Sequence, residues 1–329
     1  MVRIAYLGSP DFAVPPLAAL AAAGYEIAAV VTQPDKPRSR GRLQPTPVKQ
    51  KALELGIPVL TPQRIKTAES VAALRALAPE LMIVVAYGQI LSREILQIPQ
   101  LGAVNIHASL LPAYRGAAPI HWAIRNGEKE SGVTLMYLDE GMDTGDMICS
   151  AAVPIAAEET TGELHDRLCA LGTELLLATL PQIASGTAPR MAQQEALASY
   201  APLLKKEHEL VDWQCTAQAL HDQIRGMDPW PGTYTFYAGK RLKLWQSRLL
   251  PPPPDALATA APGEVAAVGP AGIWVRCGDG LLCLQQLQPE GKTRMDAAAF
   301  LRGNSRRKKK GHHYIISIGN GSGYTIDAS

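Results

Sequence analysis

Short apolar runs alternate with helical patterns over roughly the first 185 residues of the chain. The run Leu81–Ala86 is apolar at every position, which is typical of a parallel strand covered on both faces. We expect strands at Val2–Leu7, Ile27–Thr32, Pro58–Leu60, Leu81–Ala86, Ala103–His107 and Val133–Leu138, and helices at Phe12–Ala23, Pro47–Leu55, Ala68–Leu77 and Thr160–Ala184. Such alternation forms βαβ units and therefore predicts an α/β domain with a doubly wound, mostly parallel, Rossmann-like sheet.

The pattern changes in the C-terminal third of the chain. A helical pattern at Thr216–Met227 is followed by a proline-rich corner at Asp228–Gly232. Short strands are then expected at Thr233–Tyr237, Arg241–Trp245, Val265–Val268, Ile273–Cys277 and Leu281–Leu287. Several short strands at close spacing predict a small β-barrel of the OB type.

The predicted organisation has four parts. Residues 1–189 form the α/β domain, and 190–208 a linker, because this stretch lacks a sustained hydrophobic period. Residues 209–304 form the barrel. Residues 305–329 combine a basic run with a Gly/Ser-rich end, for which we expect a disordered or artificially added tail rather than a nucleic-acid-binding arm.

The composition of the chain excludes several classes of protein. Apolar residues make up 47% of the 329 residues and charged residues 19%, which excludes a wholly disordered chain. The net charge of +2 indicates no partner by itself. Five cysteines without a CxxC pair favour reduced thiols. No stretch approaches the ~18 apolar residues of a membrane span, and the first apolar run ends at Gly8, too early for a signal peptide. We expect a cytoplasmic monomer.

The first strand-to-helix turn argues against a dinucleotide cofactor. This turn, Gly8-Ser-Pro-Asp-Phe12, has one glycine where a dinucleotide-binding turn needs three. Without the other glycines the pyrophosphate cannot approach the helix N-terminus. We therefore expect an ordinary turn, capped by Ser9 or Asp11.

Two polar residues end one of the predicted central strands. Asn105 and His107 are two positions apart, so their side chains project from the same face. Polar groups in such a strand are costly unless they are paired or used. A carboxamide beside an imidazole suits the stabilisation of an oxyanion and the transfer of a proton. A purely structural Asn–His pair is an equally good interpretation of these two residues alone.

A glycine-rich acidic loop, Asp139–Asp146, follows the strand predicted at Val133–Leu138. We interpret Asp139, Glu140 and Asp146 as a solvated turn. Asp143 stands between Gly141 and Gly145, and loops at the carboxyl ends of parallel strands are where such sheets place their sites. Its carboxylate there would orient His107. The spacing of nearby His, Asp and Cys residues does not suit a metal site.

Several motifs together resemble the 10-formyltetrahydrofolate-dependent formyltransferases. They are Asn105–His107, Ser109–Pro112, Tyr114–Pro119, Gly141–Met147, Asp212–Trp213, Arg225–Pro231 and Lys243–Trp245. Each motif is weak alone, but jointly they are highly specific, and the resemblance extends over about residues 1–304. It is strongest to the members that formylate the methionine esterified to initiator tRNA. It implies the formyltransferase fold, 10-formyltetrahydrofolate as donor substrate without a metal, and initiator methionyl-tRNA as partner.

The resemblance also implies roles for individual residues. Asn105, His107 and Asp143 would be the catalytic trio, with Asn105 and His107 donating hydrogen bonds to the oxyanion and Asp143 fixing the imidazole and assisting removal of the amine proton. The folate pocket would include Ser109, Leu110, Leu111 and Pro112, together with the segment Val85–Ile90 and hence Tyr87, Gly88, Gln89 and Ile90.

Basic residues concentrate in two places that would suit RNA phosphates. Gln33–Lys51 holds six cations against one acid, and its prolines predict a mobile loop outside helix and sheet before Pro45. The resemblance implies that this loop reaches the tRNA acceptor stem. The C-terminal domain adds a second group of cations on one strand face. The nucleic-acid-binding candidates are Lys36, Arg38, Arg40, Gly41, Arg42, Lys205, Lys206 and Lys243.

Three other functions stay open from the sequence. A related N-formyltransferase acting on an amino-sugar nucleotide or another small amine would share the trio but would not need two basic surfaces. Hydrolysis of formyl-folate would replace the amine by water. A catalytically silent RNA-binding protein would not require Asn105, His107 and Asp143 together.

Overall fold

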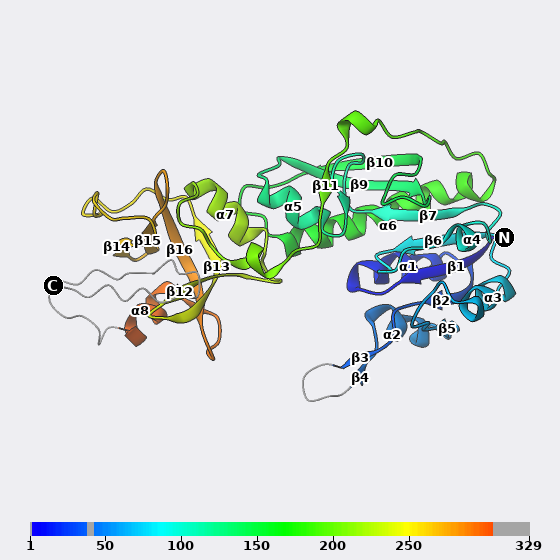
Figure 1. Cartoon of the computed structure of the whole chain (residues 1–329), viewed down its shortest axis with the longest axis horizontal. Helices are drawn as coiled ribbons and strands as arrows, with labels where there is room; N and C mark the ends of the chain where they lie inside the picture. The colour runs from blue at the N-terminus through cyan, green and yellow to red at the C-terminus, as the bar shows by residue number, and fades with distance from the viewer. Residues whose placement is uncertain (1, 38–42, 305–329) are drawn as a thin grey trace. The chain divides into compact units, whose positions relative to one another are not determined.

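The computed structural model describes residues 2–37 and 43–304 (Figure 1). The predicted loop residues Arg38, Arg40, Gly41 and Arg42 and the predicted tail 305–329 lie outside the described residues. The chain divides into two compact units. The first comprises Met1–Pro119, Glu130–Pro154 and His165–Pro202, and the second Ile120–Lys129, Ile155–Leu164 and the residues from Leu203 onward.

A seven-stranded sheet forms the centre of the first unit, with the order β10-β9-β7-β6-β1-β2-β5. Its strands are β1 (Arg3–Gly8), β2 (Glu26–Val31), β5 (Val59–Leu60), β6 (Leu81–Val85), β7 (Ala103–His107), β9 (Glu130–Tyr137) and β10 (Met147–Pro154). Neighbours from β7 to β5 pair in parallel, whereas β9 is antiparallel to both β7 and β10. The predicted mostly parallel sheet is thus confirmed, and β10 is an addition that the sequence analysis did not include.

Helices connect these strands, and all but the single-turn helix at Arg93–Leu96 lie close to where the sequence pattern places them. They are η1 (Asp11–Ala13), α1 (Val14–Ala22), α2 (Pro47–Glu54), α3 (Ala68–Ala76), the single-turn α4 (Arg93–Leu96) and α6 (Thr161–Ala184), whose first turn belongs to the second unit. Thr46 and Thr67 cap α2 and α3 by accepting hydrogen bonds from the backbone N–H groups of Lys49 and Ser70. These caps explain why α2 and α3 begin where they do.

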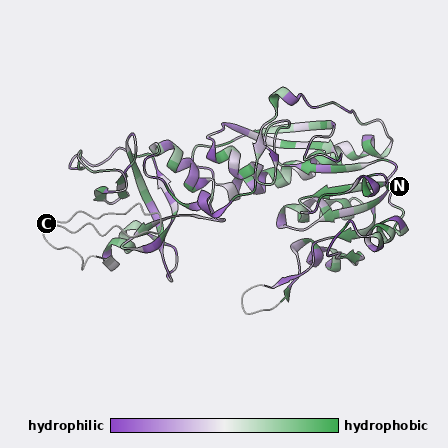
Figure 2. Cartoon of the chain, viewed as in Figure 1, coloured by the Kyte–Doolittle hydropathy of each residue, from purple (hydrophilic) through white to green (hydrophobic). Residues whose placement is uncertain are grey.

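The hydrophobic core of the first unit packs around its parallel strands. All five residues of β6 are buried, as a strand covered on both faces requires. One core cluster joins side chains of β1, β2 and β6 to α3, including Leu7, Val31, Leu74 and Met82. Strands at the centre of the sheet are hydrophobic over most of their length (Figure 2).

Short β-ladders occur where the sequence analysis expects none. β3 (Lys36–Pro37) pairs antiparallel with β4 (Leu43–Gln44), so the expectation that the prolines keep this loop out of β-structure is wrong. An exposed two-residue ladder tolerates proline because the proline nitrogen need not donate a hydrogen bond at an open edge. A second pair is parallel and joins β8 (Arg115–Gly116) to β11 (Tyr200–Ala201) in the segment predicted as a linker.

The second unit contains an antiparallel sheet with the order β12-β13-β16-β15-β14, and β17 pairs with β16. Its elements are α7 (Ala217–Arg225), β12 (Thr233–Tyr237), β13 (Lys240–Arg248), β14 (Val265–Gly269), β15 (Gly272–Arg276), β16 (Leu281–Pro289), β17 (Met295–Asp296) and α8 (Ala297–Asn304). A separate core includes Trp213, Leu244 and Phe300. The predicted strands are confirmed, and within the described residues the hydrogen-bonded path is an open one that ends at β12 and β14. None of the described helices is long and apolar enough to cross a membrane.

Candidate active site

The last residues of β7 place two polar side chains on one face of the sheet. Asn105 and His107 are 9% and 6% exposed in a strand that is otherwise apolar and buried. Among the described residues, the Asn105 carboxamide has no hydrogen-bond partner. Its carboxamide atoms are not among the fully buried, unpartnered side-chain atoms of the described residues, so solvent or another molecule can still reach them. Asn105 is therefore a candidate for binding a group that comes from outside the chain.

His107 is held by two groups, one at each ring nitrogen. Nε2 lies 3.0 Å from the carbonyl oxygen of Tyr114, which can only accept, so Nε2 is the donor. Nδ1 lies 3.7 Å from Oδ2 of Asp143, longer than a hydrogen bond. The neutral ring thus has its N–H toward Tyr114 and its lone pair toward Asp143.

Asp143 reaches His107 by a route that the sequence analysis did not expect. Because β9 is antiparallel to β7, the loop after β9 leaves the sheet beside Ala103, at the amino end of β7, where the N–H of Leu138 donates to the carbonyl of Ala103 (2.7 Å). The expectation that this loop starts at the carboxyl edge shared by the parallel strands is wrong. The loop nevertheless brings the carboxylate of Asp143 to His107.

Glycines and hydrogen bonds define the conformation of the Asp143 loop. Asp139 accepts hydrogen bonds from the N–H of Gly141 (3.0 Å) and the hydroxyl of Thr144 (2.8 Å), so it organises the turn rather than being merely solvated. A Cβ at Gly145 would lie 1.9 Å from the carbonyl oxygen of Tyr137, so only glycine fits there. Asp143 itself has a φ of +55°, in the left-handed region.

The carboxylate of Asp143 is held by the backbone of β8. Its Oδ2 accepts a hydrogen bond from the N–H of Gly116 (2.8 Å), and its side chain is 16% exposed. A Cβ at Gly116, whose φ is +119°, would lie 2.8 Å from the carbonyl oxygen of Ala201 in β11. The close approach of these two strands therefore requires glycine beside the carboxylate.

A buried arginine and the segment around residue 195 support this loop. The side chain of Arg115 is 1% exposed and donates to Oε2 of Glu195 (2.8 Å) and to Oε1 of Gln193 (3.1 Å). Burial acts to lower the pKa of Arg115, but hydrogen bonds and charges from Glu195 and Tyr200 outweigh it and raise the pKa. Neither Gln193 nor Glu195 was predicted from the sequence, because both lie in a polar segment without a motif.

Of the predicted folate residues, Ser109–Pro112 follow β7 directly. The hydroxyl of Ser109 donates to the carbonyl of Ala113 (2.6 Å), and the hydroxyl of Thr134 joins the carbonyl of Ser109 (2.8 Å) to the N–H of Leu111 (3.1 Å). Leu110 lies so close to β9 that a Cβ at Gly132 would be 2.4 Å from its Cδ2. This run is thereby anchored beside the end of β7.

The second predicted folate segment, Tyr87–Ile90, follows β6, and its side chains differ in burial and in hydrogen bonding. Tyr87 is 2% exposed, its hydroxyl is buried without a partner, and burial raises its pKa to about 12. Gln89 accepts a hydrogen bond from the N–H of Ile65 (2.8 Å), Gly88 has a φ of +86°, and the Ile90 side chain is exposed. Gln89 thus holds the neighbouring loop, whereas Ile90 is available for contact.

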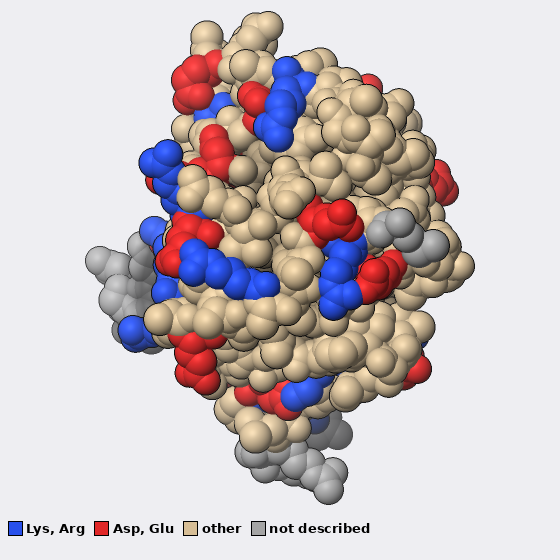
Figure 3. Space-filling model, turned by 90° about the vertical axis from the view of Figure 1, so that its right-hand side faces the viewer, with Lys and Arg blue, Asp and Glu red and all other residues tan. Residues whose placement is uncertain are grey.

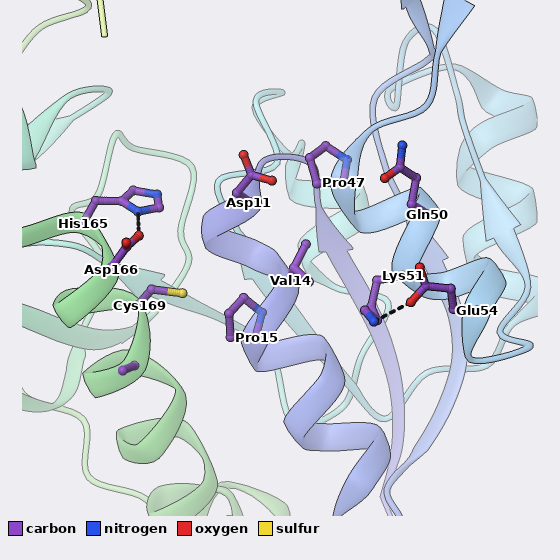
Figure 4. Close-up of a pocket in the computed structure, with 11 residues that line it drawn as sticks. Asp11, Val14, Pro15, Pro47, Gln50, Lys51, Glu54, His165, Asp166 and Cys169 are labelled. Atoms are coloured by element: carbon purple, nitrogen blue, oxygen red, sulfur yellow. Dashed lines mark hydrogen bonds and ion pairs between the residues drawn. The ribbon is translucent and has the colours of Figure 1, made fainter. Parts of the chain in front are cut away.

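A cavity of about 510 Å³ lies elsewhere in the first unit, between the start of α1, α2 and α6 (Figure 4). Asp11, Lys51 and Cys169 are among its lining residues, and the catalytic candidates are not. Lys51 forms an ion pair with Glu54, and the Cys169 thiol donates to the carbonyl of Phe12 (3.2 Å). Lys51 and Cys169 are thus engaged within the protein, and none of the lining residues is a catalytic candidate.

The described cations predicted to bind nucleic acid have different surroundings. Lys36, Lys205 and Lys206 are exposed, and Lys205 pairs with Glu207 at 3.7 Å. Lys243 is half-buried, donates to the carbonyl of Pro231 (3.1 Å) and lies over the ring of Trp245. On the face of the first unit shown in Figure 3, basic and acidic side chains alternate without forming a patch of one sign. The described residues contain no cluster of three or more His, Cys, Asp or Glu that could hold a metal ion.

Comparison with solved structures shows the fold. HypX from Aquifex aeolicus, in complex with tetrahydrofolic acid, matches 91% of this chain with a TM-score of 0.62 and 19% identity. The match covers 47% of HypX, so the chain corresponds to about half of that protein. The N-formyltransferase from Helicobacter canadensis, in complex with folinic acid and dTDP-3-aminofucose, matches 86% of this chain and 98% of its own, with a TM-score of 0.64 and 21% identity.

Sequence comparison is more specific. Residues 2–180 match the Formyl transferase family, and residues 203–305 match the family described as Formyl transferase, C-terminal domain. The methionyl-tRNA formyltransferase of Moorella thermoacetica is 52% identical over 303 residues, which cover 92% of this chain and 96% of that protein. That of Geobacter sulfurreducens is 49% identical, covering 92% and 94%. With both domain families in order and about half of its residues shared over nearly its whole length, the chain belongs to the methionyl-tRNA formyltransferase family.

Proposed function

We propose that this chain transfers the formyl group of 10-formyltetrahydrofolate to the α-amino group of initiator methionyl-tRNA. The proposal rests on one observation above all: Asp143 comes from a separate crossing of the sheet to within 3.7 Å of His107, beside the unpartnered amide of Asn105. Family membership agrees with this chemistry, because relatives that carry the name methionyl-tRNA formyltransferase share about half of its residues.

Asn105, His107 and Asp143 divide the reaction between them. The unprotonated α-amine attacks the formyl carbon, and the carbonyl oxygen becomes an oxyanion that accepts hydrogen bonds from the Asn105 amide and from His107. Because the N–H at Nε2 of His107 is already donated to Tyr114, the ring donates from Nδ1 only as an imidazolium, which the Asp143 carboxylate stabilises.

Proton transfer completes the exchange. Asp143 takes the amine proton, directly or through a water molecule, as the new carbon–nitrogen bond forms. When the oxyanion collapses, the bond from the formyl carbon to N10 breaks, and N10 takes up the proton that Asp143 removed from the amine, which restores the carboxylate. The products are tetrahydrofolate and N-formylmethionyl-tRNA.

The donor site proposed here uses the two segments that follow β6 and β7. Ser109–Pro112 and Tyr87–Ile90 come directly after neighbouring parallel strands, so they lie at the same edge of the sheet. The exposed side chain of Ile90 offers an apolar surface to a pteridine or benzoyl ring. Two proteins of the same fold were solved with tetrahydrofolic acid and folinic acid, which is compatible with a folate at this edge.

The acceptor site proposed here relies on the two basic groups. Lys36 stands at the base of the loop that contains Arg38, Arg40, Gly41 and Arg42, and Lys205, Lys206 and Lys243 belong to the second part of the chain. On β13, Arg241, Lys243 and Trp245 alternate with the buried Leu242 and Leu244, as predicted, so the cations share the face away from the core. Such a face suits a phosphate backbone.

Direct measurement of formyl transfer tests the function. The protein is incubated with 10-formyltetrahydrofolate and each of three acceptors: methionyl-tRNA, a nucleotide-linked amino sugar, and water alone. We expect formylation of methionyl-tRNA to exceed the other two rates by at least about 100-fold. Preferential formylation of the amino sugar, or release of formate alone, would overturn the proposal.

Charge reversal in the basic loop tests the acceptor site. Replacing Arg38, Arg40 and Arg42 by glutamate is expected to raise KM for methionyl-tRNA at least about tenfold, because phosphate contacts are lost. KM for the folate is expected to stay within about twofold. Equal changes in both constants would mean that the loop does not bind tRNA.

A further inference from the structure

One side chain from a distant part of the chain holds the backbone of the Asp143 loop. The Nε2 amide of Gln193 donates to the carbonyl oxygen of Asp143 (2.7 Å) and to that of Gly145 (2.8 Å). Its Oε1 accepts from Nε of Arg115 (3.1 Å). Both amide protons and the amide oxygen of Gln193 are therefore engaged, and a carboxamide is the group that can make all three bonds at once.

These hydrogen bonds belong to a connected network around Asp143. The N–H of Gly116, the residue after Arg115, donates to the Asp143 carboxylate (2.8 Å). The guanidinium of Arg115 donates to Gln193, and Gln193 in turn donates to the Asp143 carbonyl oxygen. Glu195 fixes the other side of the guanidinium (2.8 Å). The carboxylate and the backbone of Asp143 are thus held by one connected set of groups, in which Arg115 is buried, Gln193 half-buried and Glu195 exposed.

The conformation of Asp143 explains why such support is needed. Its φ of +55° lies in the left-handed region, which Asp adopts more readily than most L-residues but still as a minority conformation. Such conformations persist where surrounding contacts enforce them, and they concentrate at active sites. Without the bonds from Gln193, the loop is free to relax, and the carboxylate then moves away from Nδ1 of His107.

We propose that Gln193 is a positioning residue for formyl transfer: it enforces the backbone of Asp143 so that the carboxylate faces His107. This inference rests on the proposed function, because it assigns Asp143 a part in that reaction. Gln193 acts through Asp143 and contacts none of the groups assigned to the chemistry other than the Asp143 backbone. It therefore affects the rate of transfer rather than the binding of either substrate.

The test is a glutamate substitution with a matched control. Gln193→Glu keeps the acceptor for Arg115 but turns both donors into an acceptor facing two carbonyl oxygens. Gln194→Glu makes the same charge change one residue later, at an exposed side chain. We expect Gln193→Glu to lower kcat by about 10- to 100-fold with both KM values within about twofold, since small displacements of reacting groups cost this much. Gln194→Glu is expected to leave kcat within about twofold.

A double-mutant cycle separates positioning from general stability. In an Asp143→Asn background, we expect Gln193→Glu to lower kcat by less than about threefold, because the residue through which it acts is already disabled. If Gln193→Glu does not fold, Gln193→Met, which removes the donors without adding charge, carries the same expectations. An unchanged kcat, or the full loss persisting in the Asp143→Asn background, would overturn the inference. If the wild-type protein transfers no formyl group, the proposed function fails instead.

Discussion

Replacing the carboxylate of Asp143 by a carboxamide is the sharpest test of the site. Asn, like Asp, tolerates a left-handed φ, and its side-chain oxygen can still accept the N–H of Gly116, so Asp143→Asn is expected to fold as the wild type does. The substitution removes the negative charge 3.7 Å from Nδ1 of His107 and, with it, the group proposed to take the amine proton. The effect should therefore fall on the chemical step.

The distance sets the size of the loss. Two unit charges about 4 Å apart attract each other by about 4 kcal/mol at an effective dielectric constant of about 20. Each ~1.4 kcal/mol changes a rate tenfold, so losing the whole attraction to the imidazolium would slow transfer about 1,000-fold. Because the carboxamide dipole retains part of the attraction but cannot take the amine proton, we expect kcat of Asp143→Asn to fall at least about 100-fold.

Single-turnover transfer from 10-formyltetrahydrofolate to methionyl-tRNA measures this step directly. Asp146→Asn is the control, since Asp146 ends the same loop, is 40% exposed and lies 3.8 Å from Arg190. We expect it to keep a rate within about twofold of wild type and both variants to unfold at the wild-type temperature within about 2 °C. A folded Asp143→Asn protein with more than a tenth of the wild-type rate would refute the role given to this carboxylate.

Three further predictions concern the amide, the loop and the thiols. Asn105→Ala removes an oxyanion donor and is expected to lower kcat at least about 100-fold with an unchanged unfolding temperature; a loss below tenfold would contradict the assignment. Gly145→Ala forces the loop to shift, because the added Cβ would lie 1.9 Å from a carbonyl oxygen. We expect this variant to lose about 1–3 kcal/mol of unfolding free energy, measured by urea denaturation. Gly280→Ala, which has open space around it, is the control and should change the unfolding free energy by less than about 0.5 kcal/mol. Burial raises the pKa of the Cys277 thiol to about 12, so this thiol stays protonated at pH 8. We expect iodoacetamide to label the exposed Cys215 first and Cys277 only after unfolding, with the order of labelling read from peptide mass spectrometry.

Local patterns predicted most of the fold because the period of apolar residues reports which faces are buried. The uninterrupted run at Leu81–Ala86 predicted a central parallel strand, and the alternation at Arg241–Trp245 predicted a strand with one buried face. Both are confirmed. The direction of β9 was not predictable in this way, because an apolar run looks the same whether its neighbour is parallel or antiparallel.

The ladders of two residues were also beyond local patterns. Arg115–Gly116 pairs with Tyr200–Ala201 across 85 positions, and neither segment carries a hydrophobic period. The pairing of these two segments requires a closely packed glycine at position 116. A single glycine in a turn-rich stretch of sequence does not reveal which segment approaches it. Pairing of this kind depends on tertiary contacts rather than on propensity.

The candidate site was predictable in part. Asn105 and His107 share a face because they are two positions apart on a strand, and the structure brings Asp143 to His107 as the resemblance implies. Gln193 could not be found from the sequence, because its partners lie 50 and 78 positions away and one glutamine among polar residues carries no signal. The roles of these residues in catalysis stay predictions until the variants are measured.

The pairing of β8 with β11 affects where a truncated fragment of this enzyme can end. A fragment that stops at residue 189, where the regular α/β pattern ends, would keep the amide, the imidazole and the carboxylate. It would lose Gln193, the hydroxyl of Ser199 that accepts from the N–H of Tyr114 (2.9 Å), and the whole of β11. We therefore expect a fragment that ends before about Pro202 to lack the support of the Asp143 loop, and a nascent chain to gain that support only once this stretch has left the ribosome.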